Sequence, residues 1–383
     1  MKKALSLILA LIIMAVPATA FAEADEDAPI IWMSSLQIMI SDNKSFATAG
    51  DTVTIAVPVT DNVKVESVII GVESPSGKQN VTKYMTQYED SEWYYMSIAI
   101  TENTEAGYWN VARIKATDSS GHYMYITSLT MYQFGVKGVI ENGDVSFTKG
   151  TKYTYSPAGV KPDIKVAHKG VALEKDVDYL VKYQNNTKVG TATATVTGIG
   201  CFDGVVSKTF TIVPQTKFTV KLSTTRYTYN GKVKNPAVTV YDGKSVVPKS
   251  NYTVTYPAGR KNVGKYYVNV VMKNNYSGKK SVCFVIKPKG TTISKTTPIK
   301  NGVKVYWNKQ SVQTTGYQVQ YSTSKSFASD KKHFVSLTGK KCYRTVKGLK
   351  SGKKYYIRIR TYKKTDGKTY YSTWSKATTF TAK

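Results

Sequence analysis

The chain has 383 residues, with 54 Lys and Arg against 25 Asp and Glu, and a formal net charge of +29. It contains 29 Tyr and 27 Gly, and its short alternating segments are separated by turn residues. Beyond the first 22 residues no long stretch has apolar residues at helical spacing, which argues against helical classes of protein. We therefore predict an all-β protein. Its length exceeds one hydrophobic core and suggests about four β-sandwich domains in an elongated tandem array.

The first 22 residues have the features of a secretory signal peptide. A basic start precedes an apolar run from Ala4 to Val16, and small residues suit cleavage after Ala22. A membrane anchor would need about 20 apolar residues, and Pro17 interrupts the run too early. We predict a signal peptide at 1–22, no transmembrane segment after its cleavage, and a secreted, extracellular protein that is released or associates non-covalently with the cell wall.

Charge divides the rest of the chain into two unlike parts. Residues 23–137 carry 7 Lys and Arg against 15 Asp and Glu, a net charge of 7 − 15 = −8. Residues 138–383 carry 45 against 10, a net charge of 45 − 10 = +35. Positive charge of this size raises the local concentration of polyanions, which outside a cell include teichoic acids and acidic glycans. The alternative is that excess lysine only keeps the protein soluble.

The segment 31–137 is predicted to form an Ig-like β-sandwich. The stretches AGDTVTIAVPVTDNVKVESVIIGVESPSG and GYWNVARIKATDSSGHYMYI alternate apolar and polar residues. They resemble bacterial surface Ig-like modules, in which a G-x-W-x-V strand leads to an A-x-D-x-x-G turn. The matching residues are Gly107, Trp109, Val111, Ala116, Asp118 and Gly121.

The aspartates of this segment leave one metal site open as an alternative. Asp42, Asp51, Asp61 and Asp118 could join in binding calcium, which takes several oxygen ligands from loops. Asp is equally a turn residue, and no DxDxDG-type loop occurs. We therefore predict no metal site and no cofactor.

A repeat follows, with an offset of 74 residues. YTYSPAGVKPDIKV at Tyr153–Val166 matches YTYNGKVKNPAVTV at Tyr227–Val240, and the match continues from Gly190 and Gly264 onward. We predict two equivalent antiparallel sandwich domains, at 138–213 and 214–288, with strand-ending prolines at their boundaries.

The repeat resembles bacterial immunoglobulin-like modules of large exported proteins from Clostridia-like Gram-positives. The first copy carries their pattern as Tyr155, Gly159 and Pro162, then DYLVKYQNN and GTATATVTGIG. The second copy departs from it, because Ala258 and Gly259 replace the Asn pair. Such modules are spacers or adhesion modules without catalysis, so the resemblance implies architecture only.

Residues 289–383 resemble a fibronectin type III domain. The resemblance rests on VKVYWNKQSVQTTGYQVQYSTSKSF, LKSGKKYYIRIRTY and YYSTWSKATTF, with Trp307 on the second strand and Tyr317 and Tyr321 on the third. Leu349, Gly352 and Tyr355 match the L-x-x-G-x-x-Y of its tyrosine corner, in which a phenol anchors the start of a strand.

Alternation from Tyr355 defines a candidate binding face. Ile357 and Ile359 should point inward with Tyr355, because side chains alternate along a strand. The outward row could bind an acidic polymer by charge and stacking. The candidate face consists of Tyr356, Arg358, Arg360, Tyr362, Lys350, Lys353, Lys354, Tyr370, Tyr371 and Trp374. The alternative is an ordinary solvated face.

No catalytic residue is predicted, and we do not expect an enzyme. His122, His168 and His333 fall in three different predicted domains, and no nucleophile motif accompanies them. Cys201, Cys283 and Cys342 also fall one to a domain, so we predict no disulfide within the chain, with pairing between chains as the alternative. Asn275 occupies the position of Cys201 in the second repeat, so this cysteine is not required by the fold.

These observations predict a non-enzymatic adhesion or scaffold protein, secreted or associated with the cell surface. Its basic C-terminal domains would bind an anionic cell-wall or extracellular polysaccharide, matrix or a surface protein, with no specific nucleic acid as partner. We expect a monomer. The alternative is a carbohydrate-targeting accessory module for an extracellular hydrolase, which would stack Tyr356, Tyr370, Tyr371 and Trp374 on sugar rings.

Overall fold

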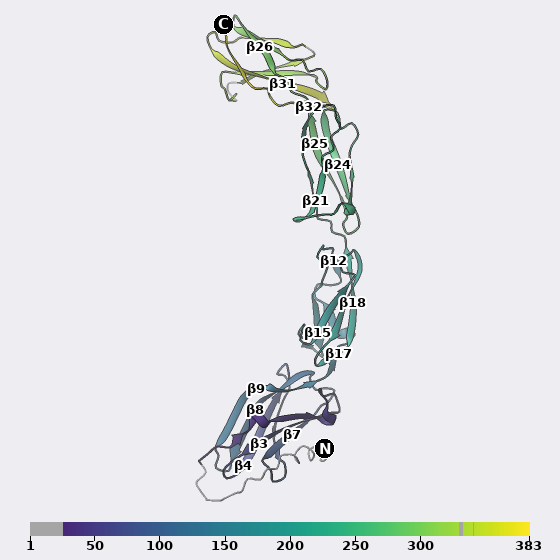
Figure 1. The fold of residues 1–383 in the computed structure, drawn as a ribbon, viewed down its shortest axis with the longest axis vertical. Helices are drawn as coiled ribbons and strands as arrows, with labels where there is room; N and C mark the ends of the chain where they lie inside the picture. Colours follow the sequence, from purple (N-terminus) through teal and green to yellow (C-terminus); the bar gives the residue numbers. More distant parts are fainter. Residues whose placement is uncertain (1–25, 329–331, 340) are drawn as a thin grey trace. The chain divides into compact units, whose positions relative to one another are not determined.

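The computed structural model describes residues 26–328, 332–339 and 341–383, and in these ranges the protein is built from β-strands (Figure 1). The predicted signal peptide, residues 1–22, lies outside the described residues. The helical segments described are short 3-10 turns at Met33–Ser35, Ser41–Asn43, Asn142–Asp144 and Lys249–Asn251. The prediction of an all-β fold is confirmed. Nowhere in the described ranges is a helix long and apolar enough to cross a membrane.

The chain divides into two compact units. Of the described residues, the first unit comprises those in 26–151, 161–185 and 192–210, and the second comprises those in 152–160, 186–191 and 211–383. The first repeat therefore contributes to both units. The predicted domain boundaries at 138, 214 and 289 stay predictions.

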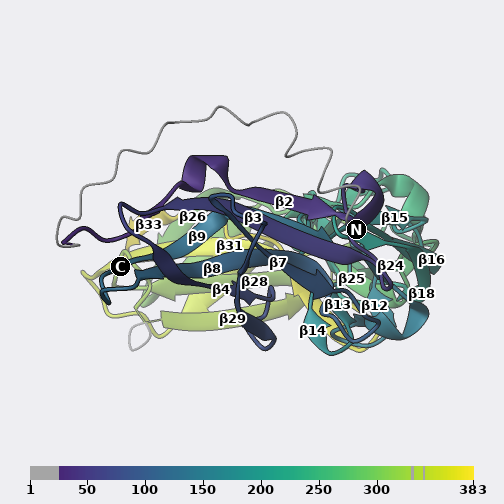
Figure 2. The ribbon, with the colours of Figure 1, turned by 90° about the horizontal axis from the view of Figure 1, so that it is seen from below.

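The first unit begins with a sandwich of two sheets. Hydrogen-bonded neighbours such as β3 and β7 run side by side (Figures 1 and 2). One sheet has the order β1-β3-β7-β6 with β2 also pairing β3, and comprises β1 (Ile30–Ile31), β2 (Gln37–Ile40), β3 (Thr52–Thr60), β6 (Thr86–Gln87) and β7 (Trp93–Ala99). The other has the order β5-β4-β8-β9, with β5 (Asn80–Tyr84), β4 (Val65–Glu73), β8 (Gly107–Asp118) and β9 (Tyr123–Val136).

Strand β8 carries the predicted strand-and-turn pattern of this sandwich. Trp109 and Val111 are buried, and the Trp109 ring stacks on Phe134 at 6.1 Å. A bulge near Val111 shifts the alternation by one residue, so Ala116 also points into the core. The buried carboxylate of Asp118 then accepts the backbone N–H groups that follow it, which closes the turn to β9.

The two repeats have the same strand order. In the first repeat, one sheet consists of β11 (Val145–Phe147), β13 (Ile164–His168) and β14 (Val171–Ala172). The other sheet consists of β12 (Lys152–Thr154), β18 (Val205–Val213), β16 (Gly190–Gly198) and β15 (Tyr179–Gln184). A small additional pair is formed by β10 (Gly138–Val139) and β17 (Phe202–Asp203). In the second, the sheets are β19 (Thr219–Leu222), β21 (Val238–Asp242) and β22 (Ser245–Val246), then β20 (Arg226–Thr228), β25 (Lys279–Lys287), β24 (Gly264–Met272) and β23 (Tyr252–Thr255).

Matching contacts support the repeat residue by residue. Lys152 pairs with Thr211 in a parallel ladder, and 74 residues later Arg226 pairs with Val285 in the same way. The hydroxyl of Tyr183 donates to the carbonyl of Pro162. In the second copy Tyr256 donates to Pro236 at 2.7 Å. The sequence repeat is therefore a structural repeat.

The second unit ends in two further sheets. The smaller has the order β26-β27-β30, with β26 (Ile293–Ile299), β27 (Gly302–Trp307) and β30 (Tyr343–Lys347). The larger has the order β29-β28-β31-β32, with β29 (Lys332–Thr338), β28 (Gly316–Ser322), β31 (Lys354–Thr365) and β32 (Lys368–Tyr371), and β33 (Thr378–Thr381) also pairs with β31. Trp307, Tyr317 and Ile357 lie in the core between these sheets, and the inward orientation of Ile357 was predicted.

The predicted tyrosine corner is present at the start of β31. Tyr355 is 7% exposed, and its hydroxyl oxygen accepts the backbone N–H of Lys350 at 3.1 Å. Its ring stacks on Phe380 at 5.7 Å. Gly352 has φ +74°, which glycine adopts without strain. The corner thus fixes how the chain starts β31.

Tyr355 and Tyr356 should differ sharply in their effect on stability. Tyr355→Ala removes a buried ring and should cost about 3–5 kcal/mol. Tyr355→Phe removes only the hydroxyl and should cost about 1 kcal/mol, and Tyr356→Ala should stay under about 1 kcal/mol. Hydrogen exchange of β31 peptides in the full chain measures these local stabilities. Equal losses from the two alanine variants would contradict the assignment of Tyr355 to the buried row and Tyr356 to the outer row.

Candidate binding face

Two arginines on β31 are positioned by two glutamines on the neighbouring strand β28. The register places Arg358 opposite Gln320 and Arg360 opposite Gln318. Arg358 Nε donates to Gln320 Oε1 at 2.6 Å, and Arg360 Nε donates to Gln318 Oε1 at 2.8 Å. Each arginine therefore has one edge of its guanidinium fixed by a neutral acceptor.

Aromatic rings lie against both guanidinium groups. The Arg358 guanidinium carbon lies 4.0 Å from the ring centre of Phe327 and 4.9 Å from that of Trp374. The Arg360 carbon lies 4.3 Å from Trp374 and 3.8 Å from Tyr371. We call these five residues the arginine stack. Such contacts are favourable, and more so where water is partly excluded.

Two serines hold Trp374 in the arginine stack. Residues 372–377 form no strand, but the backbone N–H of Thr361 donates to Ser372 Oγ at 3.0 Å. The N–H of Ile359 donates to Ser375 Oγ at 3.1 Å. The segment that carries Trp374 is thereby bound to β31 on both sides of the tryptophan.

The arginine stack is electrostatically unusual because like charges are close together and partly buried. Burial lowers the pKa of both guanidinium groups, and the charge of Arg358 lowers the pKa of Arg360 further. Among the described residues no carboxylate forms an ion pair with either arginine. Both pKa values begin far above neutrality, so both groups stay charged.

The structure corrects the predicted exposure of Tyr362. It was expected to be exposed on the outer row, but it is only 4% exposed. Its register partner is Gly316, whose missing side chain leaves room for the phenol, and its hydroxyl donates to the Leu337 carbonyl at 3.1 Å. Tyr371 covers it from the other side at 6.1 Å between ring centres. Tyr362 therefore belongs to the packed part of this face.

The other predicted residues are only partly brought together. Tyr371 and Trp374 join the two arginines, whereas Tyr370 pairs with Lys363 and so lies on the opposite face of the sheet. Tyr356 is partly buried, at the other end of the row. Lys350, Lys353 and Lys354 are exposed around the tyrosine corner. The candidate face is thus a compact arginine stack with a separate lysine group.

Sequence reasoning missed three residues of this face. Gln318 and Gln320 alternate with the buried Tyr317 and Val319, so the period of two already marked them as outward. Their pairing with the arginines depends on the register between strands, which the sequence does not show. Phe327 comes from the loop after β28, and no local pattern predicted its contact with Arg358.

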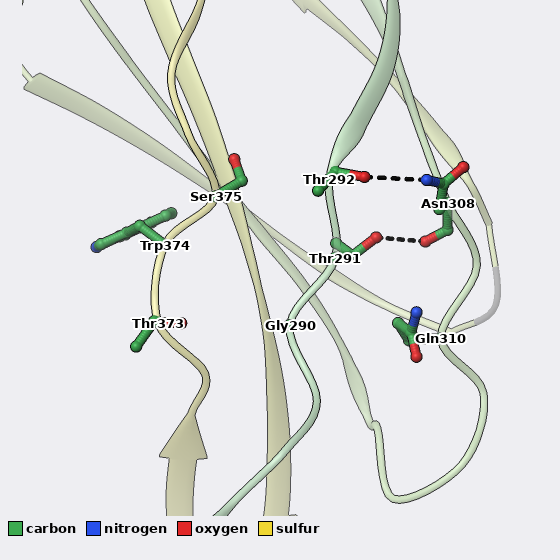
Figure 3. Close-up of a pocket in the computed structure, with 8 residues that line it drawn as sticks. All are labelled: Gly290, Thr291, Thr292, Asn308, Gln310, Thr373, Trp374 and Ser375. Atoms are coloured by element: carbon green, nitrogen blue, oxygen red, sulfur yellow. Dashed lines mark hydrogen bonds between the residues drawn. The ribbon is translucent and has the colours of Figure 1, made fainter. Parts of the chain in front are cut away.

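A polar hollow lies beside the arginine stack (Figure 3). Its volume is about 390 Å³, and it is lined by Gly290, Thr291, Thr292, Asn308, Gln310, Thr373, Trp374 and Ser375, none of them charged. Asn308 donates its amide to Thr292 Oγ1 at 2.9 Å and accepts from Thr291 Oγ1 at its carbonyl. The Trp374 ring points away from the side chains of Asn308 and Gln310 (Figure 3). The hollow therefore offers hydroxyl and amide groups without an aromatic floor.

Positive charge is more concentrated than the division at residue 138 suggests. Residues 138–210 carry 9 Lys and Arg against 7 Asp and Glu, a net charge of +2. Residues 211–383 carry 36 against 3, a net charge of +33. In the described part of the chain, every ion pair lies between residues 44 and 203. We call residues 211–383 the basic segment.

Aromatic rings replace carboxylates beside the cations of the basic segment. Nine of its described Lys and Arg side chains lie over an aromatic ring, at 3.8 to 5.9 Å from the ring centre. They are Lys221, Lys234, Arg260, Lys265, Lys280, Lys304, Lys354, Arg358 and Arg360. A ring attracts a cation through its quadrupole and carries no net charge, so the positive field remains.

Three of the four aspartates considered for calcium, Asp51, Asp61 and Asp118, serve separate local roles. Asp51 accepts from Lys44 Nζ at 2.7 Å and from the backbone and hydroxyl of Thr48, each at 2.8 Å. Asp61 accepts the N–H groups of the turn that follows it, as Asp118 does. Within the described residues no group of three or more His, Cys, Asp or Glu side chains could hold a metal ion.

The histidines and cysteines are dispersed. His122 and His168 each lie beside an aspartate, Asp118 at 3.1 Å and Asp144 at 3.3 Å, and the His333 ring stacks on Tyr321. Cys201 is 1% exposed, and burial raises the pKa of its thiol to about 11. A thiol with such a pKa stays protonated at neutral pH and is a poor nucleophile.

Comparison with known proteins identifies the C-terminal part. Residues 287–380 match the family model of the fibronectin type III domain. This part of the chain is a fibronectin type III domain. Tandem fibronectin type III and Ig-like domains are commonly used for adhesion or scaffolding and are usually non-catalytic.

The search of the curated proteins finds no match, and two solved structures are similar to this chain at low identity. The crystal structure of domains A168-A170 from titin has 13% identity and a TM-score of 0.19, covering 92% of this chain and 98% of that chain. The chicken CNTN1 FN1-FN3 domains have 13% identity and a TM-score of 0.21, covering 90% and 97%. These likenesses carry no argument about ligands.

Asp51 should make the first unit sensitive to acid. Hydrogen bonds from Lys44 first, and then from Thr48, hold the pKa of its carboxyl well below the usual value. A lowered folded-state pKa gives stability above the unfolded pKa of about 3.9, which is lost as pH falls towards the folded value. Asp51→Asn should therefore destabilise β3 at pH 7, and its deficit should shrink below about pH 4.

Hydrogen exchange of β3 peptides at several pH values measures this effect. Asp90→Asn, at an exposed position, is the matched control and should change little at any pH. An Asp51→Asn deficit that stays constant down to pH 2 would show that the carboxylate charge contributes nothing.

Proposed function

We propose that the protein is a non-enzymatic adhesion or scaffold protein whose basic segment binds an anionic extracellular polysaccharide. The observation that supports this most is the combination of 36 basic and 3 acidic residues with cations held over aromatic rings. The rings order the cationic side chains without neutralising them. A polyanion would then bind positively charged side chains that are already ordered. Binding would therefore cost the protein little conformational entropy.

The location assigned to this function is extracellular. The predicted signal peptide supports export, and an acidic glycan at or near the cell surface would be the available polyanion. Binding would follow mainly from release of the counterions that surround the polymer. It would therefore depend on the number of unpaired cations more than on any single lysine.

Stacking on sugar rings is less well supported than charge. Tyr371 and Trp374, which were candidates for a sugar platform, already lie against Arg360 at 3.8 and 4.3 Å. Tyr370 lies on the other face of the sheet from Tyr371. A sugar ring would have to compete with a guanidinium for the same aromatic faces.

Retention on immobilised heparin and on an acidic wall polymer tests the proposal. The chain should bind at low salt and elute as salt rises, because affinity falls steeply with salt when counterions are released. One variant reverses six exposed lysines of the basic segment to Glu, namely Lys232, Lys244, Lys273, Lys295, Lys347 and Lys368. It should elute at much lower salt than the unchanged chain.

A second variant provides a control with the same total charge. It reverses six exposed lysines outside the basic segment, namely Lys149, Lys152, Lys161, Lys165, Lys182 and Lys188. Its elution should change little. Equal shifts in the two variants would contradict the assignment to the basic segment. Retention that persists at about 1 M salt, where the screening length is about 3 Å, would contradict binding by charge.

A further inference from the structure

The arginine stack contains donor groups that the fold itself does not use. In the described part of the chain, each arginine hydrogen-bonds through Nε to a glutamine, and neither forms a hydrogen bond through its Nη atoms. Partly buried donors without partners are unfavourable unless something else occupies them. Water or a ligand must therefore satisfy these four Nη groups.

The two positive charges of Arg358 and Arg360 favour an anion over water beside their Nη groups. Arg358 and Arg360 are two residues apart on one strand, so their Cα atoms are about 7 Å apart on the same face. The charge of Arg358 lowers the pKa of Arg360, and no described carboxylate forms an ion pair with either arginine. An anion between or beside them would relieve the repulsion between the two charges. Like charges held together and partly desolvated are a feature of functional sites.

The geometry also favours one chemical class of anion. A guanidinium is planar and presents paired N–H groups that match two oxygens of a phosphate, sulfate or carboxylate, which an ammonium does not. Here the ring contacts and the glutamines fix the plane of each guanidinium before any ligand arrives. Fixed donors lose little conformational entropy on binding.

We propose that Arg358 and Arg360 form a subsite for a sulfate or phosphate ester of the bound polysaccharide. This inference rests on the proposed function and adds a selective site to the general charge of the basic segment. The lysines supply attraction that salt weakens, whereas the arginine stack recognises the oxyanion itself. Trp374 and Tyr371 act here as supports for the guanidinium groups.

The decisive variant keeps the charge and changes the geometry. Arg358→Lys with Arg360→Lys preserves both positive charges but removes the planar donors. We expect this double variant to bind a heparin tetrasaccharide at about 0.15 M salt at least about tenfold more weakly, as expected for loss of a charged hydrogen-bond pair. Lys350→Gln with Lys354→Gln removes two charges outside the arginine stack and should weaken binding less than about twofold. Calorimetry on the full chain measures both.

The source of the ester is tested with two probes. The sulfated tetrasaccharide represents sulfate esters, and a short glycerol phosphate oligomer represents phosphodiesters. Loss of binding for either probe in the arginine double variant supports the subsite and names its ester. Equal affinity of the double variant and the unchanged chain for both probes would overturn the subsite. In that case heparin retention of the unchanged chain would still support the proposed function, and its absence would reject both.

A spectroscopic measurement keeps the test valid if the double variant folds poorly. In the unchanged chain, Arg side-chain N–H resonances can be followed by NMR while a probe is added. Arg358 and Arg360 should shift, and Arg226, Arg260 and Arg344 serve as internal controls within the same basic segment. Shifts of equal size at all five arginines would show general charge binding and overturn the subsite.

Discussion

The basic segment has only three acidic side chains, and much of its surface chemistry follows from this constraint. With 36 basic and 3 acidic side chains, ion pairing cannot order its cations. Aromatic rings take that role for nine of the described basic residues. Because a ring carries no net charge, the cations gain order while their field persists. This persistent field is what supports the proposed binding of a polyanion.

Arginine and lysine occupy different places on this surface because their charged groups differ in hydration. Of the five arginines in the basic segment, three place the guanidinium within 5.5 Å of an aromatic ring centre. A guanidinium is weakly hydrated and packs flat on a ring, so it tolerates the partly buried row of β31. Lysine needs its ammonium in water, and Lys350, Lys353 and Lys354 are exposed. The same strand thus combines a buried apolar row with a charged row at modest cost.

Structural features that depend on residue spacing within one short segment could be predicted from the sequence. The all-β fold, the fibronectin type III domain, the tyrosine corner of Tyr355 and the alternation of β31 all follow from spacing within one segment. The burial of Tyr362 could not be predicted in this way, because it depends on Gly316 lying opposite in the register of another strand. The contacts of Gln318, Gln320 and Phe327 with the arginines depend on register and loop path for the same reason. The concentration of positive charge after residue 210 could also have been found in the sequence, by counting charged residues over shorter ranges.

The two parts of the chain differ in ion pairing: the described ion pairs all lie before residue 211, whereas cations lie over aromatic rings in both parts. Before residue 211, lysines pair with acids, as Lys44 does with Asp51 at 2.7 Å and Lys137 with Asp203 at 2.8 Å. Such pairs neutralise charge locally, and residues 23–137 keep a net charge of −8. Under the proposed function, a polyanion would therefore be repelled by that part and attracted by the basic segment. Screening at physiological salt limits both effects to about 8 Å, so only contact with the basic segment itself can retain the polymer. The proposed function therefore assigns no ligand to the N-terminal sandwich.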